Sequence, residues 1–210
     1  MTGYFVTGTD TNVGKTVLSA LLVAALNAVY WKPVQTGAIE STDREAVRRW
    51  TGAEEERLPP ERFRFDPPVS PHLAAREAGI TITLDAFEFP AAPANRKWIV
   101  EGAGGVMAPL NDHELMRDLI LRIGFPAVVA ARTSLGTINH TLLTLSALRE
   151  ARIPIHGVAL IGDENMENRR AIEHYGDIEV IGAVPRLTKI NRGVLKHTFR
   201  KNFQRAAFRM

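Results

Sequence analysis

Short apolar runs alternate with longer segments of helical spacing along this chain of 210 residues. The apolar runs predict strands at residues 4–7, 29–34, 98–100, 127–131, 155–161 and 179–184. The segments between them predict helices at 16–28, 137–151 and 165–175. Strands that alternate with helices form βαβ units, so we expect an α/β fold: a mostly parallel, doubly wound sheet with helices on both faces. In such sheets ligands bind beyond the carboxyl ends of the strands.

The C-terminal part of the chain differs in charge from the rest. From Val180 onward there are eight Lys and Arg and no Asp or Glu. Its apolar residues have the spacing of one helix face; they are Leu195, Phe199, Phe203, Ala206 and Met210. This predicts a closing helix that packs on the domain and keeps its basic residues in water. A basic tail is also typical of nucleic-acid binding, an alternative that steeply salt-dependent binding to duplex DNA would favour.

Composition narrows the class of protein. The single series of strands predicts one domain over residues 1–210, and we interpret the proline-rich segment 53–71 as a connection or strap rather than a linker. The chain has no cysteine, which excludes disulfides, cysteine-bound zinc, iron–sulfur clusters and thiol nucleophiles. No apolar stretch is long enough to span a membrane, and the N-terminus lacks the pattern of a signal peptide. A cytoplasmic location is therefore expected.

Residues 8–16 read Gly-Thr-Asp-Thr-Asn-Val-Gly-Lys-Thr, directly after the first predicted strand and at the start of a helix. Glycines let backbone N–H groups turn toward a phosphate, and the helix N-terminus adds positive potential. In such loops the lysine reaches the β- and γ-phosphates and the next hydroxyl binds magnesium, roles that fit Lys15 and Thr16. Five residues, rather than the usual four, separate Gly8 from Gly14. The pattern predicts a variant P-loop that binds nucleotide phosphates with Mg²⁺.

Charged residues follow two of the other predicted strands. Lys32 lies at the carboxyl end of the second strand, where a second lysine can neutralise a phosphoryl group or a substrate anion. Glu101 ends an apolar run and precedes Gly-Ala-Gly-Gly, so its carboxylate is well placed for magnesium. By pattern alone, Asp43 is the N-terminal residue of a helix. We interpret His140 as structural, and His72 carries little signal.

Four blocks of sequence occur in a specific order along the chain. They are residues 5–16, Lys-Pro-Val-Gln-Thr-Gly at 32–37, Glu-Gly-Ala-Gly-Gly at 101–105 and Leu-Gly-Thr-Ile-Asn-His at 135–140. Ser-Pro-His at 70–72 and Gly-Ala-Val-Pro at 182–185 are weaker matches. Together the blocks resemble the dethiobiotin synthetase family. The P-loop alone is shared by many nucleotide enzymes, whereas the combination is specific.

The resemblance implies a reaction and a set of residues. The reaction is the ATP-dependent carboxylation of 7,8-diaminopelargonate with CO2 and closure of a cyclic urea, with release of ADP and phosphate. The implied catalytic residues are Lys15, Lys32, Thr11 and Thr36, and the implied metal ligands are Thr16, Asp43 and Glu101. The implied nucleotide contacts are Gly8, Thr9, Asp10, Thr11, Asn12, Val13, Gly14, Lys15, Thr16, Glu101, Gly102, Gly104, Gly105, Gly162, Pro185 and Leu187. The implied substrate contacts are Thr36 and, reaching the neighbouring subunit of a homodimer, Gly136, Thr137, Ile138 and Asn139. No membrane or nucleic-acid partner is implied.

Three positions depart from the family pattern. Asn12 stands where an acidic residue is frequent, the segment before Lys32 is shorter than usual, and Gly162 replaces an Asn that reads adenine. Two other P-loop classes remain as alternatives. A cobyrinic acid amidating synthase normally has a cysteine nucleophile, and a partition-type ATPase usually has a second lysine in the loop; this sequence has neither.

Overall fold

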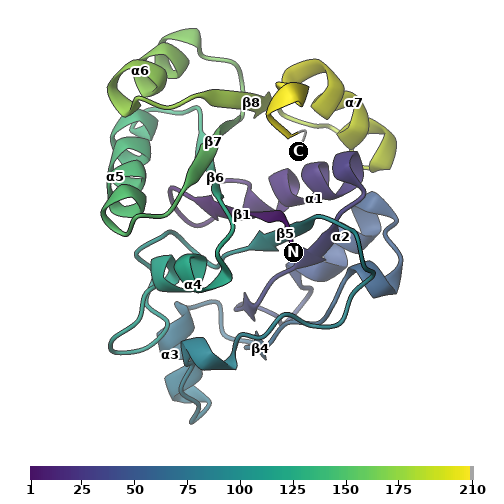
Figure 1. Cartoon of the computed structure of the whole chain (residues 1–210), viewed down its shortest axis with the longest axis vertical. Coiled ribbons are helices and arrows are strands. Elements are labelled where there is room, and N and C mark those ends of the chain that lie inside the picture. Colours follow the sequence, from purple (N-terminus) through teal and green to yellow (C-terminus); the bar gives the residue numbers. More distant parts are fainter. Residues whose placement is uncertain (209–210) are drawn as a thin grey trace.

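A six-stranded parallel sheet forms the centre of the structure, a computed structural model that describes residues 1–208. The strands, in spatial order, are β2 (Val29–Trp31), β5 (Trp98–Glu101), β1 (Gly3–Gly8), β6 (Ala127–Arg132), β7 (Ile155–Ile161) and β8 (Val180–Val184). Every neighbouring pair is parallel. The predicted α/β class is confirmed, and β1 lies near the middle of the sheet with the loop that follows it at the carboxyl edge (Figure 1).

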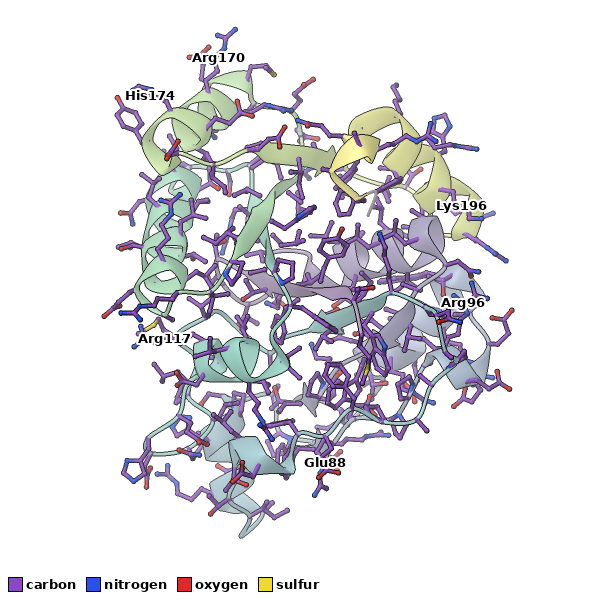
Figure 2. All side chains as sticks on the ribbon, in the orientation of Figure 1. Glu88, Arg96, Arg117, Arg170, His174 and Lys196 are labelled. Atoms are coloured by element: carbon purple, nitrogen blue, oxygen red, sulfur yellow. The ribbon has the colours of Figure 1, made fainter. Side chains whose placement is uncertain are left out.

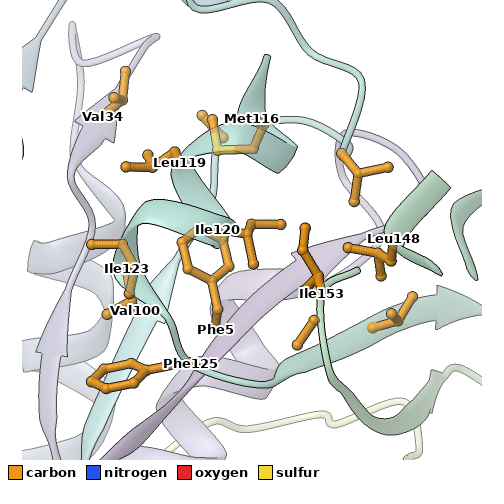
Figure 3. Close-up of a cluster of buried hydrophobic side chains, with 14 of the residues drawn as sticks. Phe5, Val34, Val100, Met116, Leu119, Ile120, Ile123, Phe125, Leu148 and Ile153 are labelled. Carbon is orange, nitrogen blue, oxygen red and sulfur yellow. The ribbon is translucent and has the colours of Figure 1, made fainter. Parts of the chain in front are cut away.

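Helices cover both faces of the sheet because successive strand residues point to opposite sides. In β1, Phe5 faces one apolar cluster while Tyr4 and Val6 face the other. The cluster with Tyr4 and Val6 is covered by α1 (Lys15–Leu26), α2 (Asp43–Thr51) and α7 (Arg192–Asn202). The cluster with Phe5 is covered by α3 (Pro71–Glu77), α4 (Met116–Ile123), α5 (Thr137–Glu150) and α6 (Met166–Gly176), and Figure 3 shows α4 packed over Phe5.

The predicted strand at 29–34 is wrong as a single element, because it divides at Lys32-Pro33. Residues of β2 join the main sheet, whereas β3 (Val34–Gln35) pairs with β4 (Phe63–Arg64) in a separate two-stranded sheet. Pro33 has no N–H to donate to a sheet ladder, which ends the first strand there. Its carbonyl accepts hydrogen bonds from the backbone N–H groups of Arg62 and Phe63 instead. The proline-rich segment thus turns the chain toward the cleft described below.

The predicted closing helix is correct in its first half only. Helix α7 ends at Asn202, and Phe203 then forms a β-bridge with Gly182 of β8. The ring of Phe203 occupies the space of a missing side chain, since a Cβ on Gly182 would lie 2.3 Å from it. Ala206 is exposed and Phe208 is buried in its place; Met210 lies outside the described residues.

Two helices were not predicted, α3 and α4, because short loops with many polar residues surround them. The other predicted helices and strands agree with the structure to within two residues at each end. Polar side chains such as Arg170, His174 and Lys196 lie at the periphery of α6 and α7 (Figure 2). Among residues 1–208, no helix combines the length and the apolar character needed to cross a membrane.

Candidate functional site

The loop between β1 and α1 has the backbone conformation that its glycines predict. Gly14 precedes the first residue of α1 with φ 95°, in the left-handed region that favours glycine. A Cβ at this position would lie 2.7 Å from the side chain of Ile161. The free N–H groups of the first helical turn therefore face the carboxyl edge of the sheet, where an anion is stabilised.

A cleft of about 1010 Å³ opens beside this loop. Thirteen of the predicted site residues line it, namely Thr9, Asp10, Thr11, Asn12, Gly14, Lys15, Thr16, Lys32, Thr36, Asp43, Glu101, Gly104 and Gly105. They come from segments far apart in sequence, which the parallel sheet brings to one edge. Three predicted residues pack behind the loop instead, namely Gly8, Val13 and Gly102. Gly8 lies against Val13, and Gly102 lies against the ring of Phe5.

Lys32 is the centre of a buried network of charges. Its Nζ lies 2.6 Å from Asp43 Oδ2 and 3.0 Å from Glu101 Oε1. The hydroxyl of Thr16 lies 3.0 Å from Asp43 Oδ1 and 3.0 Å from Glu101 Oε1. Glu101 is fully buried, and its second oxygen accepts a hydrogen bond from Tyr30. Burial of these charges is tolerated because each one has a partner.

The network fixes the protonation states of its members. Burial opposes the charge on Lys32, but Glu101 and Asp43 outweigh it and raise the pKa of this lysine. Burial likewise disfavours the charge on Asp43, but the ammonium of Lys32 outweighs it and lowers the pKa of the carboxyl. For Lys15, burial dominates and lowers the pKa to about 8. Lys32 and Asp43 are therefore charged at neutral pH, whereas Lys15, with a pKa of about 8, titrates closer to neutral pH than an ordinary lysine.

Three oxygen-bearing side chains here have the chemistry of a magnesium site. Thr16 is in the first turn of α1, Asp43 is the first residue of α2, and Glu101 is the last residue of β5. Asp43 has the helix N-terminal position that its pattern predicts, held by a capping box between Thr42 and Glu45. Hard oxygen ligands of this kind hold Mg²⁺ together with phosphate oxygens and water. Residues 1–208 contain no cluster of three or more His, Cys, Asp or Glu able to bind a metal.

Sequence reasoning missed Gln35, a buried side chain between Lys32 and Thr36. Its Oε1 accepts the backbone N–H of Asp43 at 3.0 Å, and its Nε2 donates to the carbonyl of Thr36 at 2.7 Å. Gln35 thus ties the start of α2 to the end of β3. Its position within the block at 32–37 was the available signal, but only Lys32 and Thr36 were assigned roles in this block from the sequence.

The helix α5 contributes cleft residues other than those predicted. His140, Leu143 and Thr144 line the cleft, and the side chain of His140, which we interpreted as structural, is exposed there. Gly136, Thr137, Ile138 and Asn139, which the resemblance assigns to a neighbouring subunit, do not line it. The hydroxyl of Thr137 donates to the carbonyl of Arg132 within the chain. Leu135, just before them, is fully exposed.

The predicted base contacts also lie outside the cleft. Gly162 follows β7 with φ 129°, and a Cβ there would lie 2.5 Å from the hydroxyl of Thr133. Pro185 and Leu187 follow β8. Between these two segments Arg186 pairs with Asp163 at 3.0 Å, and both side chains are exposed. These residues follow the carboxyl ends of β7 and β8, on the side of the sheet away from Lys32.

Comparisons with known proteins find a matching family model, similar sequences and a similar solved structure. A family model described as an AAA domain matches residues 2–193. The ATP-dependent dethiobiotin synthetase BioD of Rhodopseudomonas palustris (strain HaA2) is 48% identical over 198 residues, which are 94% of this chain and 92% of that protein. The protein of the same name from Brucella melitensis biotype 2 is 47% identical over 198 residues, with the same coverage. The crystal structure of a ParA family ATPase from Chlorobium tepidum matches with a TM-score of 0.49 and 11% identity, covering 97% of this chain and 91% of that one.

Proposed function

The chain belongs to the family of ATP-dependent dethiobiotin synthetases, and we propose that its cleft beside the P-loop is where it closes the cyclic urea of dethiobiotin. It is an ATP-dependent enzyme of biotin biosynthesis. The observation that carries the assignment of the site is the meeting of two buried lysines, Lys15 and Lys32, at the mouth of a phosphate-binding loop. Two cations at one edge suit a reaction in which an anionic substrate attacks an anionic phosphate.

The family reaction proceeds through an activated carbamate. One neutral amine of 7,8-diaminopelargonate takes up CO2 and releases a proton, which gives a carbamate. A carbamate oxygen attacks the γ-phosphorus of ATP, the bond to the bridging oxygen breaks, and ADP leaves. The second amine then attacks the carbonyl carbon of the mixed anhydride, phosphate leaves with the electron pair, and a second proton is released.

Each charged residue has a separate task in this proposal. Lys15 stabilises negative charge on the transferring phosphoryl group, and Lys32 stabilises the carbamate. The hydroxyls of Thr11 and Thr36 line the cleft and hydrogen-bond the substrate or the carbamate. The oxygens of Thr16, Asp43 and Glu101 would hold Mg²⁺, which would further neutralise the phosphate charge when bound. Most of the rate enhancement then comes from positioning and electrostatics.

The walls of the cleft favour a substrate with an aliphatic chain. Apolar residues line part of the cleft, among them Val69, Pro71, Val106, Met107, Pro109 and Leu143. Such residues fit the hydrocarbon part of a diaminated fatty acid, while the polar edge receives its amines and CO2.

A two-fold dimer completes the proposed site. Gly136, Thr137, Ile138 and Asn139 cannot contact a substrate in their own chain's cleft without lining it, so we assign them to the partner's cleft. The exposed apolar side chains of Leu135 and Leu143 near these residues support an interface there. A cytoplasmic location remains a prediction from the sequence.

One incubation tests the function directly. The protein is mixed with diaminopelargonate, bicarbonate, Mg²⁺ and ATP, and dethiobiotin is measured by mass spectrometry, with Lys15→Ala as the control that lacks phosphate binding. Product that requires ATP and disappears in the control is expected. ATP hydrolysis without dethiobiotin would instead favour a partition-type ATPase.

A further inference from the structure

Tyr30 is a fully buried tyrosine whose hydroxyl contacts the candidate metal site from behind. It is the middle residue of β2, and its hydroxyl lies 3.0 Å from Glu101 Oε2. In the parallel register Tyr30 pairs with Ile99, which lies on the same face of the sheet as Glu101. The tyrosine therefore reaches the carboxylate from inside the core. It does not line the cleft.

The two oxygens of Glu101 have different partners. Oε1 faces the hydroxyl of Thr16 and the ammonium of Lys32, each at 3.0 Å. Within residues 1–208, the hydroxyl of Tyr30 is the one donor that contacts Oε2. A carboxylate can rotate about its terminal bond, since that torsion has broad minima. A donor on Oε2 stops this rotation and keeps Oε1 directed at the phosphate loop.

Tyr30 acts as a donor because its hydroxyl keeps its proton. A phenolic hydroxyl ordinarily has a pKa of about 10, so it is protonated at neutral pH. An ionised carboxylate only accepts hydrogen bonds, so the direction of this bond is fixed. Bonds to a charged acceptor in a low-dielectric interior are stronger than neutral ones.

We propose that Tyr30 is a positioning residue for the metal–nucleotide site, which sets the orientation of the Glu101 carboxylate through the hydrogen bond to Oε2. It touches neither substrate nor nucleotide and acts through Glu101 alone. The proposal rests on the metal site assigned under the proposed function. Partners behind a metal ligand commonly change metal affinity by 10- to 100-fold when removed, and we expect a loss of about tenfold here.

The test measures metal binding separately from turnover. Tyr30→Phe keeps the ring and removes the hydroxyl. Mn²⁺ is titrated into full-length protein saturated with ADP, and free Mn²⁺ is read from its electron paramagnetic resonance signal. The variant is expected to bind Mn²⁺ about tenfold more weakly. Its kcat/KM should fall at low Mg²⁺ and recover at high Mg²⁺.

Tyr4→Phe is the matched control. Tyr4 is also buried, lies on β1, and packs against His156 and Phe208 away from the cleft. This variant should bind Mn²⁺ as the unmodified protein does. Equal Mn²⁺ affinity for Tyr30→Phe and the unmodified protein would overturn the proposal, even if the variant unfolds at a lower temperature. If the unmodified protein with ADP binds no Mn²⁺, the metal site of the proposed function fails, and the role of Tyr30 fails with it.

A second measurement needs no change at Tyr30. The chain has three tyrosines, Tyr4, Tyr30 and Tyr175, so a protein labelled with 3-fluorotyrosine gives three fluorine resonances. Tyr4→Phe and Tyr175→Phe assign the third resonance by elimination. The Tyr30 resonance should shift when Mg²⁺ is added to the ADP complex, because the metal draws electron density from Glu101. A Tyr30 resonance that Mg²⁺ leaves unmoved would overturn the proposal.

Discussion

Two parts of the proposed nucleotide site are built in opposite ways: the phosphate end beside the P-loop, and the base end that the family resemblance implies after β7 and β8. The phosphate end, made of Lys15, Thr16, Lys32, Asp43 and Glu101, places charges in the interior, with Lys32 5% exposed and Glu101 0%. The base end, made of Gly162, Asp163, Pro185, Arg186 and Leu187, has a glycine and one ion pair whose side chains are 73% and 83% exposed. Exposed pairs of this kind contribute about 0–1 kcal/mol.

The contrast indicates where specificity is fixed by the fold. A buried charge without a partner costs several kcal/mol, so Lys32, Asp43 and Glu101 at the phosphate end depend on each other. Residues at the base end touch solvent and depend on little else. We therefore expect strict recognition of the triphosphate and loose recognition of the base.

The largest effects should come from the two lysines. Lys15→Ala and Lys32→Ala should each lower kcat/KM by at least about 100-fold, since each removes a cation from developing charge. Their effects on stability should differ. Lys32→Ala leaves Glu101 and Asp43 without their cation and should cost about 3–5 kcal/mol. Lys15 donates instead to the neutral backbone carbonyl of Asp10, so its loss should cost much less.

Urea unfolding and steady-state kinetics on both variants check this pair of expectations. Retention of more than about a tenth of kcat/KM in Lys32→Ala, a loss below about 1.4 kcal/mol, would remove that lysine from the reaction. Equal stability of the two variants would show that the network around Lys32 is not needed for folding.

The metal requirement should distinguish the two ends next. Asp43→Asn and Glu101→Gln keep the size of each side chain but weaken oxygen ligation, so half-maximal activity should need at least about tenfold more Mg²⁺. Asp163→Asn at the base end is the matched control, because the same chemical change there touches only an exposed pair. Unchanged Mg²⁺ titrations for both phosphate-end variants would remove them from the metal site.

How far the sequence predicts the molecule also differs between the two ends. The P-loop, Lys32 and Glu101 were found because each lies at the carboxyl end of a predicted strand or directly after it, and the parallel sheet places all carboxyl ends at one edge. The pairing of Lys32 with both carboxylates was not predicted, since their contact depends on the break at Pro33, which turns β3 out of the main sheet.

Tyr30 and Gln35 were missed because a buried hydroxyl or amide has no sequence pattern that separates it from a core residue. At the other end, the bridge of Phe203 to Gly182 replaced half of a predicted helix, because a long-range contact outweighed local spacing.

Assembly should depend on the exposed apolar residue before α5. Leu135→Asp should raise the dissociation constant of the proposed dimer by at least about tenfold, since burying a leucine contributes about 1.5–3 kcal/mol. Its activity should fall on dilution more than that of the unmodified protein. Leu121→Asp on α4, also an exposed leucine, is the control and should leave the mass unchanged. Sedimentation at working concentration measures both; a monomer with full activity would contradict the shared site.

Base selectivity should be weak because position 162 cannot hold a reading side chain. Gly162 has φ 129°, and the hydroxyl of Thr133 fills the space of its Cβ. Losing one good polar pair changes affinity by about 0.5–1.5 kcal/mol, so GTP and CTP should support turnover within about tenfold of ATP. The measurement is kcat/KM for the three nucleotides at equal Mg²⁺. A preference for ATP above about a hundredfold, more than about 2.7 kcal/mol, would show that another group reads the base.

The smallest effect expected is a dependence of stability on pH that arises in β7, the strand that ends at Gly162. His156 lies against Tyr4 and Phe208 with its Nε2 buried and unpartnered among the described residues. Burial lowers its pKa, with Glu179 opposing the shift. The unfolded chain therefore takes up a proton first as the pH falls below about 6.5, so this contribution is complete above that pH and declines below it, by less than about 1.4 kcal/mol per pH unit. The phosphate end should lose stability in a different pH window, because the pKa of Asp43 is lowered and its pairing with Lys32 is lost only below the ordinary carboxyl range.

Urea midpoints between pH 7 and 5 should fall for the unmodified protein and less for His156→Gln, with the exposed His174→Gln as control. Parallel slopes for all three proteins would show that the neutral form of His156 contributes nothing to the folded state.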